Sequence, residues 1–196
     1  PHEAIQEGIS IIYQERQILL ELSVAENIYL GRMPVNKFGI IDIAKANKMA
    51  KEIIDDFGLP ISPSTKVKDL SIAYQQMVEI MKAYSRENLK VICFDEPTAS
   101  LSDAEIDSLF EIIAKLKAQG KIIIYVSHRM AEIQEIADKV AIFKDGHYVD
   151  TVVTKEVPEQ QLIKTMVGRD LGDIFNSLDR NDKIGDVPLE VKGVSS

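Results

Sequence analysis

The sequence predicts an α/β fold built on a largely parallel β-sheet. Short apolar runs alternate along the chain with segments of helical periodicity. The runs at 91–94 and 122–126 are apolar throughout, which is typical of strands buried on both faces of a sheet. When such strands alternate with helices, the helices usually cover the faces of the sheet.

The first half of the chain contains two predicted strands and two long predicted helices. The β-branched run at 9–13 predicts the first strand, and the run at 91–94 predicts the second. Residues 42–57 predict an amphipathic helix that Gly58 stops. Ser71 begins another helix, whose apolar side chains fall on one stripe.

The second half begins with the clearest helix of the sequence. Ser102 and Glu105 form a capping box, apolar residues then recur at helical spacing, and Gly120 ends the helix. The run at 122–126 predicts a third buried strand, and residues 131–137 predict the helix that follows it.

A hairpin and a last helix follow. Strand patterns at 140–143 and 148–152 flank Asp145-Gly146, which is a strong signal for a tight hairpin turn. Residues 159–167 then predict a short amphipathic helix.

We expect residues 1–171 to form one incomplete domain. Residues 18–89 break the alternation of strands and helices and predict a helical subdomain inserted into the α/β core. Residues 172–188 are polar and aperiodic and predict a linker, and residues 189–196 predict the start of a second unit. Because the chain opens with Pro1 and ends on this pattern, we expect it to be a segment of a longer protein.

The composition excludes several classes of protein. Hydrophobic residues make up 45% of the chain, which is enough for a core and excludes disorder as its main state. The longest apolar run, at 122–126, is far shorter than the roughly 18 residues of a membrane span. Cys93 is the single cysteine, which excludes an intramolecular disulfide and favours the cytoplasm. A net charge of −8 disfavours nucleic acid as a partner.

Candidate catalytic residues follow the predicted strands. Asp95 and Glu96 come directly after the run at 91–94, at the carboxyl end of a strand, where parallel sheets bind ligands. One carboxylate could hold Mg²⁺ through water, and the other could take a proton from an attacking water. Taken alone, a solvated acidic pair at the start of a loop is the more common alternative.

Three further residues could join this site. His128 follows the run at 122–126 and could donate a hydrogen bond to a terminal phosphate. Gln14 follows the first strand, and its neutral amide could ligate Mg²⁺ and orient water. Ser71 opens a helix, whose first backbone N–H groups attract phosphate. Taken singly, each residue is more often structural: a surface histidine, a surface amide and an ordinary N-cap.

Together these residues occur in the order found in an ABC ATPase domain. Gln14 resembles the Q-loop residue, and His128 resembles the switch histidine. The ABC signature corresponds to the run from Leu70 to Gln75. The Walker B segment and its D-loop correspond to Asp95-Glu96-Pro97-Thr98-Ala99-Ser100-Leu101. The resemblance covers nearly the whole chain and implies a P-loop NTPase-like core with an inserted helical subdomain.

A narrower resemblance is to the tandem ATPases of monosaccharide importers of the ribose, galactose, xylose and arabinose type. These polypeptides carry two ABC halves, and this chain resembles the first half. The runs that carry the resemblance are Tyr13-Gln14-Glu15, Gln75-Gln76-Met77-Val78-Glu79-Ile80, Ser127-His128-Arg129 and Met166-Val167-Gly168-Arg169.

The chain departs from the family pattern at two motifs. Ala73 stands where the family signature has a glycine. Its backbone N–H can still donate a hydrogen bond, but its side chain would crowd a phosphate. The aspartate position of the D-loop holds Ser102, and Asp103 follows it.

The 196 residues also contain no G-x-x-x-x-G-K-[ST] sequence, the P-loop or Walker A motif. In the family this loop, its strand and an adenine-stacking aromatic precede the Q-loop, so we expect them before Pro1. The resemblance therefore predicts a sheet without the Walker A strand, which leaves an exposed edge or an unfilled place. It also predicts that this chain alone binds ATP weakly, does not hydrolyse it, and self-associates.

The resemblance implies a role for each candidate on one side of an ATP site. Asp95 and Gln14 would hold Mg²⁺, Glu96 would act as general base, and His128 would contact the γ-phosphate.

A second set of residues would contact the cofactor as well. Ser71 and the N–H of Ala73 would act on ATP held by the P-loop of another ABC half. Gln75 and Asp103 complete the expected ATP-binding residues.

The implied partners are a second ABC half, the membrane subunits of a permease docked on residues 18–89, and, indirectly, a sugar-binding protein. These partners would place the protein in the cytoplasm on the inner face of the membrane. One alternative is an ABC ATPase that works off the membrane, in translation or DNA repair. Another is a non-catalytic half kept for docking and dimer closure, a reading to which Ala73 gives weight.

Overall fold

A computed structural model describes residues 2–167 of the chain. The predicted linker at 172–188 and the predicted strand at 189–196 lie outside the described residues. The elements, in order, are α1 (His2–Gln6), β1 (Ile9–Ile12), α2 (Val24–Ile28), α3 (Ile43–Asp56), η1 (Val67–Asp69), α4 (Ile72–Tyr84), β2 (Val91–Asp95), α5 (Asp103–Ala118), β3 (Ile122–Val126), α6 (Met130–Ile136), β4 (Lys139–Lys144), β5 (His147–Val153), η2 (Thr154–Glu156) and α7 (Glu159–Val167).

The described residues divide into two compact units, one that ends at Ala137 and one that begins at Asp138. The strands and long helices predicted within residues 2–167 are all present, within one or two residues of the expected bounds. The short helices α1 and α2 were not predicted, because five residues are too few to show a helical period.

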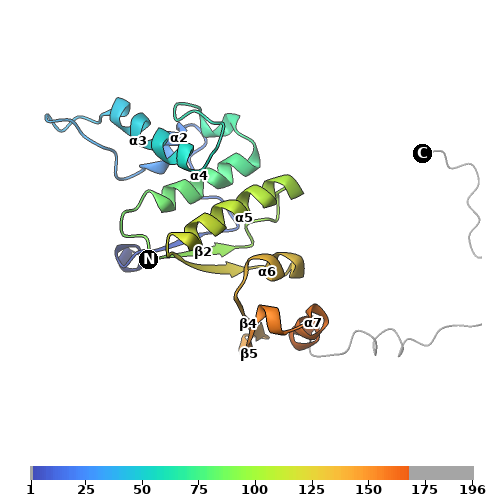
Figure 1. Ribbon diagram of the computed structural model, residues 1–196. Coiled ribbons are helices and arrows are strands. Elements are labelled where there is room, and N and C mark those ends of the chain that lie inside the picture. The colour runs from blue at the N-terminus through green and yellow to red at the C-terminus, as the bar shows by residue number, and fades with distance from the viewer. Residues whose placement is uncertain (1, 168–196) are drawn as a thin grey trace, which may run out of the picture. The chain divides into compact units, whose positions relative to one another are not determined.

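The first unit is built on a parallel sheet with the strand order β1-β2-β3, which confirms the predicted fold class. Phe94 at the centre lies opposite Ile12 of β1 and Tyr125 of β3. Because the three strands run in the same direction, their carboxyl ends meet at one edge of the sheet (Figure 1).

Gly8 sets the register between β1 and β2. Its carbonyl oxygen accepts hydrogen bonds from Lys90 N at 2.8 Å and Val91 N at 3.0 Å. Its φ is +92°, and a Cβ at this position would lie 2.1 Å from the Asn88 carbonyl oxygen. Only glycine fits both the backbone angle and this close approach.

Helices α4 and α5 cover one face of the sheet, and this face is the core of the unit (Figure 1). The capping box predicted for α5 is present, since Glu105 Oε2 accepts from both Ser102 N and Ser102 Oγ. The core side chains come from β1, β2, α4 and α5: Ile12, Met77, Ile80, Ala83, Ile92, Phe94, Ile106, Leu109, Phe110, Ile112, Ile113 and Leu116.

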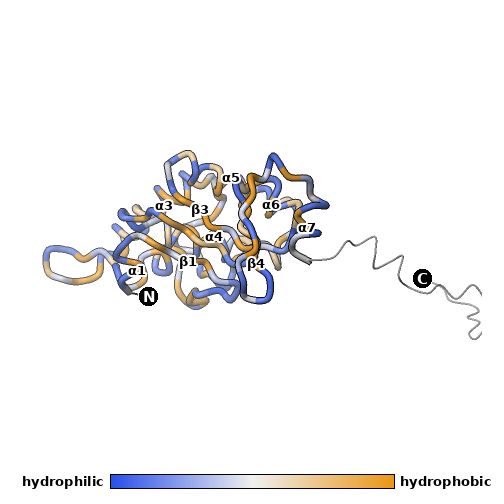
Figure 2. The backbone as a smooth tube through the Cα atoms, turned by 90° about the horizontal axis from the view of Figure 1, so that it is seen from below, coloured by the Kyte–Doolittle hydropathy of each residue, from blue (hydrophilic) through white to orange (hydrophobic). Residues whose placement is uncertain are grey.

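The opposite face of the sheet is exposed in the described chain, so the prediction that the strands are buried on both faces was wrong. The side chains of Ile122, Ile124 and Val126 are 61%, 51% and 47% exposed. Figure 2 shows β1 and β3 as hydrophobic segments of the backbone. Within residues 2–167, β3 pairs with β2 alone, so the predicted exposed edge is present.

Helix α4 belongs to two cores at once. Met77 and Ile80 face the sheet, whereas Val78 and Met81 pack against the helical segment formed by α2 and α3. This double packing explains why residues 75–81 are buried without interruption. A helix that is apolar on two sides joins the two cores into one unit.

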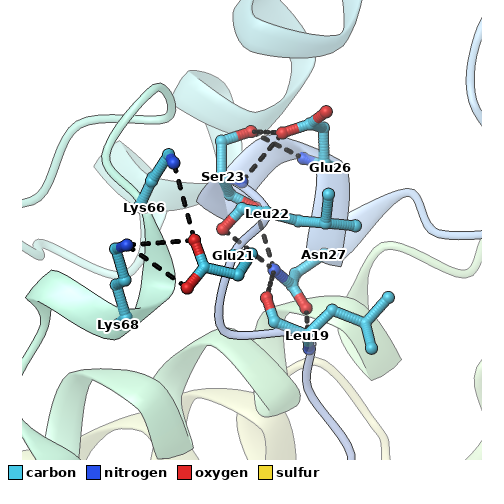
Figure 3. Close-up of polar contacts among 8 residues, drawn as sticks. All are labelled: Leu19, Glu21, Leu22, Ser23, Glu26, Asn27, Lys66 and Lys68. Atoms are coloured by element: carbon cyan, nitrogen blue, oxygen red, sulfur yellow. Dashed lines mark hydrogen bonds and ion pairs between the residues drawn. The ribbon is translucent and has the colours of Figure 1, made fainter.

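A turn before α2 is held together by a single buried amide (Figure 3). Asn27 Oδ1 accepts from Leu19 N at 2.8 Å, and its Nδ2 donates to the carbonyl oxygens of Leu19 and Ser23 at 2.9 and 3.0 Å. Ser23 and Glu26 cap the same helix, and Glu21 pairs with Lys68 outside it (Figure 3).

The second unit contains the predicted hairpin, with β4 and β5 antiparallel. Asp145 and Gly146 have φ angles of +50° and +78°, as a tight hairpin turn of this kind requires. Leu162 of α7 is buried. No helix among residues 2–167 is long and apolar enough to cross a membrane.

The Asn27 contacts generate a test of stability. Asn27→Asp replaces the donor amide by a carboxylate that faces backbone carbonyl oxygens inside the protein. We expect the free energy of unfolding to fall by about 3 kcal/mol, measured by urea denaturation at pH 7. The control Asn47→Asp, half-buried on α3, should cost less than about 1 kcal/mol. Equal losses in the two variants would contradict this role for Asn27.

Candidate functional site

The centre of the candidate site is a pair of side chains at the ends of β2 and β3. Glu96 Oε1 lies 3.0 Å from His128 Nδ1. Glu96 N also donates to the Val126 carbonyl oxygen at 3.0 Å, which ties the two strand ends together. An ionised carboxylate only accepts hydrogen bonds, so His128 presents a protonated Nδ1 to it.

Backbone strain accompanies this pair. Glu96 has a φ of +45°, in the left-handed region that residues other than glycine rarely adopt. Strained residues of this kind persist where the surroundings fix them, and they gather at functional sites. The imidazole of His128 is 73% exposed and the carboxylate of Glu96 is 33% exposed, so both groups can reach a ligand from solvent.

A cavity of about 630 Å³ opens beside Glu96. Its walls come from the segment after β1, the start of α4, and the turn after β2. Gln14 and Gln75 line it together with Glu96, so the structure brings three of the predicted site residues to one hollow.

Asp95 is the last residue of β2 and is half-buried. Carboxylate and amide oxygens of the kind supplied by Asp95, Glu96 and Gln14 are the ligands that Mg²⁺ prefers. These residues therefore fit a magnesium ion that keeps several waters. Within residues 2–167, no three side chains of His, Cys, Asp and Glu gather as a metal-binding group.

Two predicted ATP-binding residues near the start of α4 are buried. Ala73 is only 4% exposed. Gln75 is also buried, and its Nε2 donates to the carbonyl oxygens of Val67 at 3.2 Å and Leu70 at 3.1 Å. The amide of Gln75 therefore holds its own subdomain together. Gln75 thus contacts the backbone before α4 as well as lining the cavity, which the motif pattern alone did not reveal.

Ser71 and Asp103 lie at helix starts, as predicted. Ser71 is exposed and caps α4, where its Oγ accepts from Tyr74 N at 3.4 Å. Asp103 is the first residue of α5, is exposed, and lies next to the cap residue Ser102. Both side chains are accessible to a ligand outside this unit.

The structure adds a contact that the sequence analysis missed. Glu79 of α4 accepts a hydrogen bond from Gln17 N at 2.5 Å, and Lys82 Nζ donates to the Gln17 carbonyl oxygen at 3.3 Å. Both polar groups of the Gln17 backbone are thus held by α4, three residues after Gln14. The sequence signal was available, because Glu79 lies in a run that resembles the sugar-importer group.

Burial shifts the pKa values of both side chains that hold the Gln17 backbone, Glu79 and Lys82. Desolvation raises the pKa of the Glu79 carboxyl and lowers the pKa of the Lys82 ammonium. Glu79 is only 5% exposed, and its second oxygen, Oε2, has no hydrogen-bond partner among the described residues.

Comparison with known protein families matches residues 1–99 to the ABC transporter family. The arabinose import ATP-binding protein AraG of Mannheimia succiniciproducens is 46% identical over 194 residues, which are 98% of this chain and 38% of that protein. AraG of Escherichia coli is 49% identical over 173 residues, which are 88% of this chain and 34% of that protein. The chain thus spans little more than a third of these relatives.

Solved structures agree on the fold. CbiO1 from Clostridium perfringens, part of the ABC transporter complex cbiONQ, matches with a TM-score of 0.66 at 22% identity, over 89% of this chain and 68% of its own. The ADP conformation of MJ1267, an ATP-binding cassette of an ABC transporter, matches with a TM-score of 0.66 at 21% identity, over 90% and 71%.

The raised pKa of Glu79 generates a pH-dependent prediction. The folded state favours the neutral carboxyl, so this residue costs stability as the pH rises above its ordinary value of 4.5. Glu79→Gln stays neutral and keeps the acceptor for Gln17 N. We expect it to raise the melting temperature at pH 8 and to change it little at pH 4.5.

Glu111→Gln, on the exposed side of α5, is the control and should shift the melting temperature equally at the two pH values. If Glu79→Gln lowered the melting temperature at pH 8, the buried carboxylate would be stabilising and this interpretation wrong.

Proposed function

The chain belongs to the ABC transporter family, and from this premise we propose that it is part of an ATP-hydrolysing subunit that drives the import of a monosaccharide. The observation that carries the proposal is the contact between Glu96 and His128 at the ends of two parallel strands, beside a cavity that Gln14 also lines. In a P-loop-type site these positions receive the terminal phosphate and the attacking water.

Each residue of this edge has a chemical task. Glu96 accepts the proton of the attacking water, and its contact with His128 holds the carboxylate in place. His128 donates a hydrogen bond to the terminal phosphate as negative charge builds up on it. Asp95 and Gln14 would hold a Mg²⁺ ion through oxygen ligands and water, and that ion would supply charge neutralisation at the phosphates.

Two helix starts act on nucleotide held by another ABC half. The exposed N-terminus of α4, with Ser71 as its cap, favours a phosphate through its backbone N–H groups and helix dipole. Asp103 lies at an exposed helix start and is available to the same interface. The N–H of Ala73 and the side chain of Gln75 contribute to the same nucleotide contact, and Gln75 also fixes the start of α4 through its bond to the Val67 carbonyl oxygen.

The proposal includes the domain boundaries and partners inferred from the sequence. Residues 1–171 form an ABC domain whose helical part, 18–89, docks on the membrane subunits of a permease at the inner face of the membrane. A linker at 172–188 leads to a second ABC half, and a sugar-binding protein delivers the sugar to the permease. Without its partners, the chain self-associates through the exposed edge of β3.

Arabinose is the first candidate sugar, because relatives 46–49% identical to this chain are named for its import. The same names argue against the alternative of an ABC ATPase that works in translation or DNA repair.

Glu96→Gln in the intact protein tests the proposed chemistry. Because only the proton acceptor is lost, we expect steady ATP hydrolysis to fall by about 100-fold or more while ATP binding is retained. Phosphate release and equilibrium ATP binding should be measured with the second ABC half inactivated, so that it cannot mask the effect. Glu87→Gln, in the exposed loop before β2, is the matched control, and equal turnover in the two variants would remove Glu96 from the mechanism.

Uptake of labelled sugars tests the proposed cargo. A strain that lacks the gene should lose arabinose uptake, and the wild-type gene should restore it, whereas the gene with Glu96→Gln should not. Ribose, xylose and galactose serve as parallel substrates. If loss of the gene left the uptake of all four sugars unchanged, the assignment to monosaccharide import would be wrong.

A further inference from the structure

A buried carboxylate is bonded to both of the loops that carry Glu96 and His128. Glu132 of α6 is only 4% exposed, yet it receives four donors. Its Oε1 accepts from Thr98 Oγ1 at 2.7 Å and lies 2.8 Å from Arg129 Nη1. Its Oε2 accepts from the hydroxyl groups of Tyr125 and Ser127, each at 2.9 Å.

These donors come from both sides of the candidate site. Thr98 lies in the turn after β2, two residues beyond Glu96. Ser127 and Arg129 flank His128 in the loop between β3 and α6. Ser127 Oγ also accepts from Arg129 N at 3.0 Å, which closes the loop around the histidine. One carboxylate therefore ties the loop that carries the proposed base to the loop that carries the histidine.

Burial of this carboxylate is costly unless every lone pair is used. An ionised carboxylate offers about four acceptor sites, and here two donors meet each oxygen. Fully satisfied buried networks are rigid and fix one arrangement of the groups they join. An apolar side chain would fill the same space without the cost of desolvating a charge. The best explanation for a carboxylate at this buried position is therefore that it holds the loops after β2 and β3 in a fixed arrangement.

We propose that Glu132 is a positioning residue for ATP hydrolysis, which sets the distance and orientation of Glu96 and His128 through Thr98 and Ser127. This inference rests on the function proposed above. Thr98 is the link to test, because it is 3% exposed and its hydroxyl reaches across from the turn after β2 to α6.

A pair of Thr98 variants separates positioning from packing. Thr98→Val keeps the volume of the side chain and removes the hydroxyl, whereas Thr98→Ser keeps the hydroxyl and removes the methyl group. In the intact protein with its second ABC half inactivated, Thr98→Val should lower kcat by about 10- to 100-fold, with the KM for ATP changed by less than about twofold. Thr98→Ser should retain most of the wild-type kcat. Glu135→Gln, at an exposed position of α6, should leave kcat unchanged.

The outcomes distinguish this inference from the proposed function. Near wild-type turnover of Thr98→Val would overturn the inference, and so would a loss of kcat in Thr98→Ser as large as that in Thr98→Val, which would indicate packing alone. Glu96→Gln is assayed in parallel. If it is inactive while Thr98→Val is active, the positioning role fails and the proposed function stands. If Glu96→Gln is active, the proposed function itself fails.

Discussion

The parallel register of three strands is the constraint on which the rest of the structure depends. Because β1, β2 and β3 run side by side in one direction, the residues at and just after their carboxyl ends come to the same edge of the sheet: Gln14, Asp95-Glu96 and Ser127-His128. Gly8 fixes one side of this register through a close backbone contact, and the hydrogen bond from Glu96 N to the Val126 carbonyl oxygen fixes the other. The chemistry of the edge follows from this arrangement.

Helix α4 connects the parallel sheet to the helical segment formed by α2 and α3. It packs on the sheet with one side and on α2 and α3 with the other, so its start cannot move without disturbing two cores. The backbone of Gln17 is held between Glu79 and Lys82 of the same helix. The segment after β1 and the signature are therefore both attached to α4, which suits a protein proposed to couple nucleotide binding to a partner.

Local sequence features predicted local structure well. The capping box at Ser102 and Glu105 and the turn at Asp145-Gly146 depend on neighbouring residues alone, and both are present. The pairing of Glu96 with His128 was foreseeable because parallel strands share an edge. The exposure of individual side chains was not foreseeable. The apolar composition of β3 does not tell whether both of its faces are covered, and the signature pattern does not tell that Ala73 and Gln75 are buried. Glu132 escaped notice because its four donors assemble only in the fold.

The central claim is that the edge formed by Glu96 and His128 receives the terminal phosphate of ATP. An experimental structure of the intact protein carrying Glu96→Gln, with Mg²⁺ and ATP bound, tests it most directly. The account predicts the γ-phosphate within hydrogen-bond distance of His128, and the side chain at position 96 within reach of a water in line with that phosphate. A well-occupied nucleotide whose phosphates contact neither residue would contradict it.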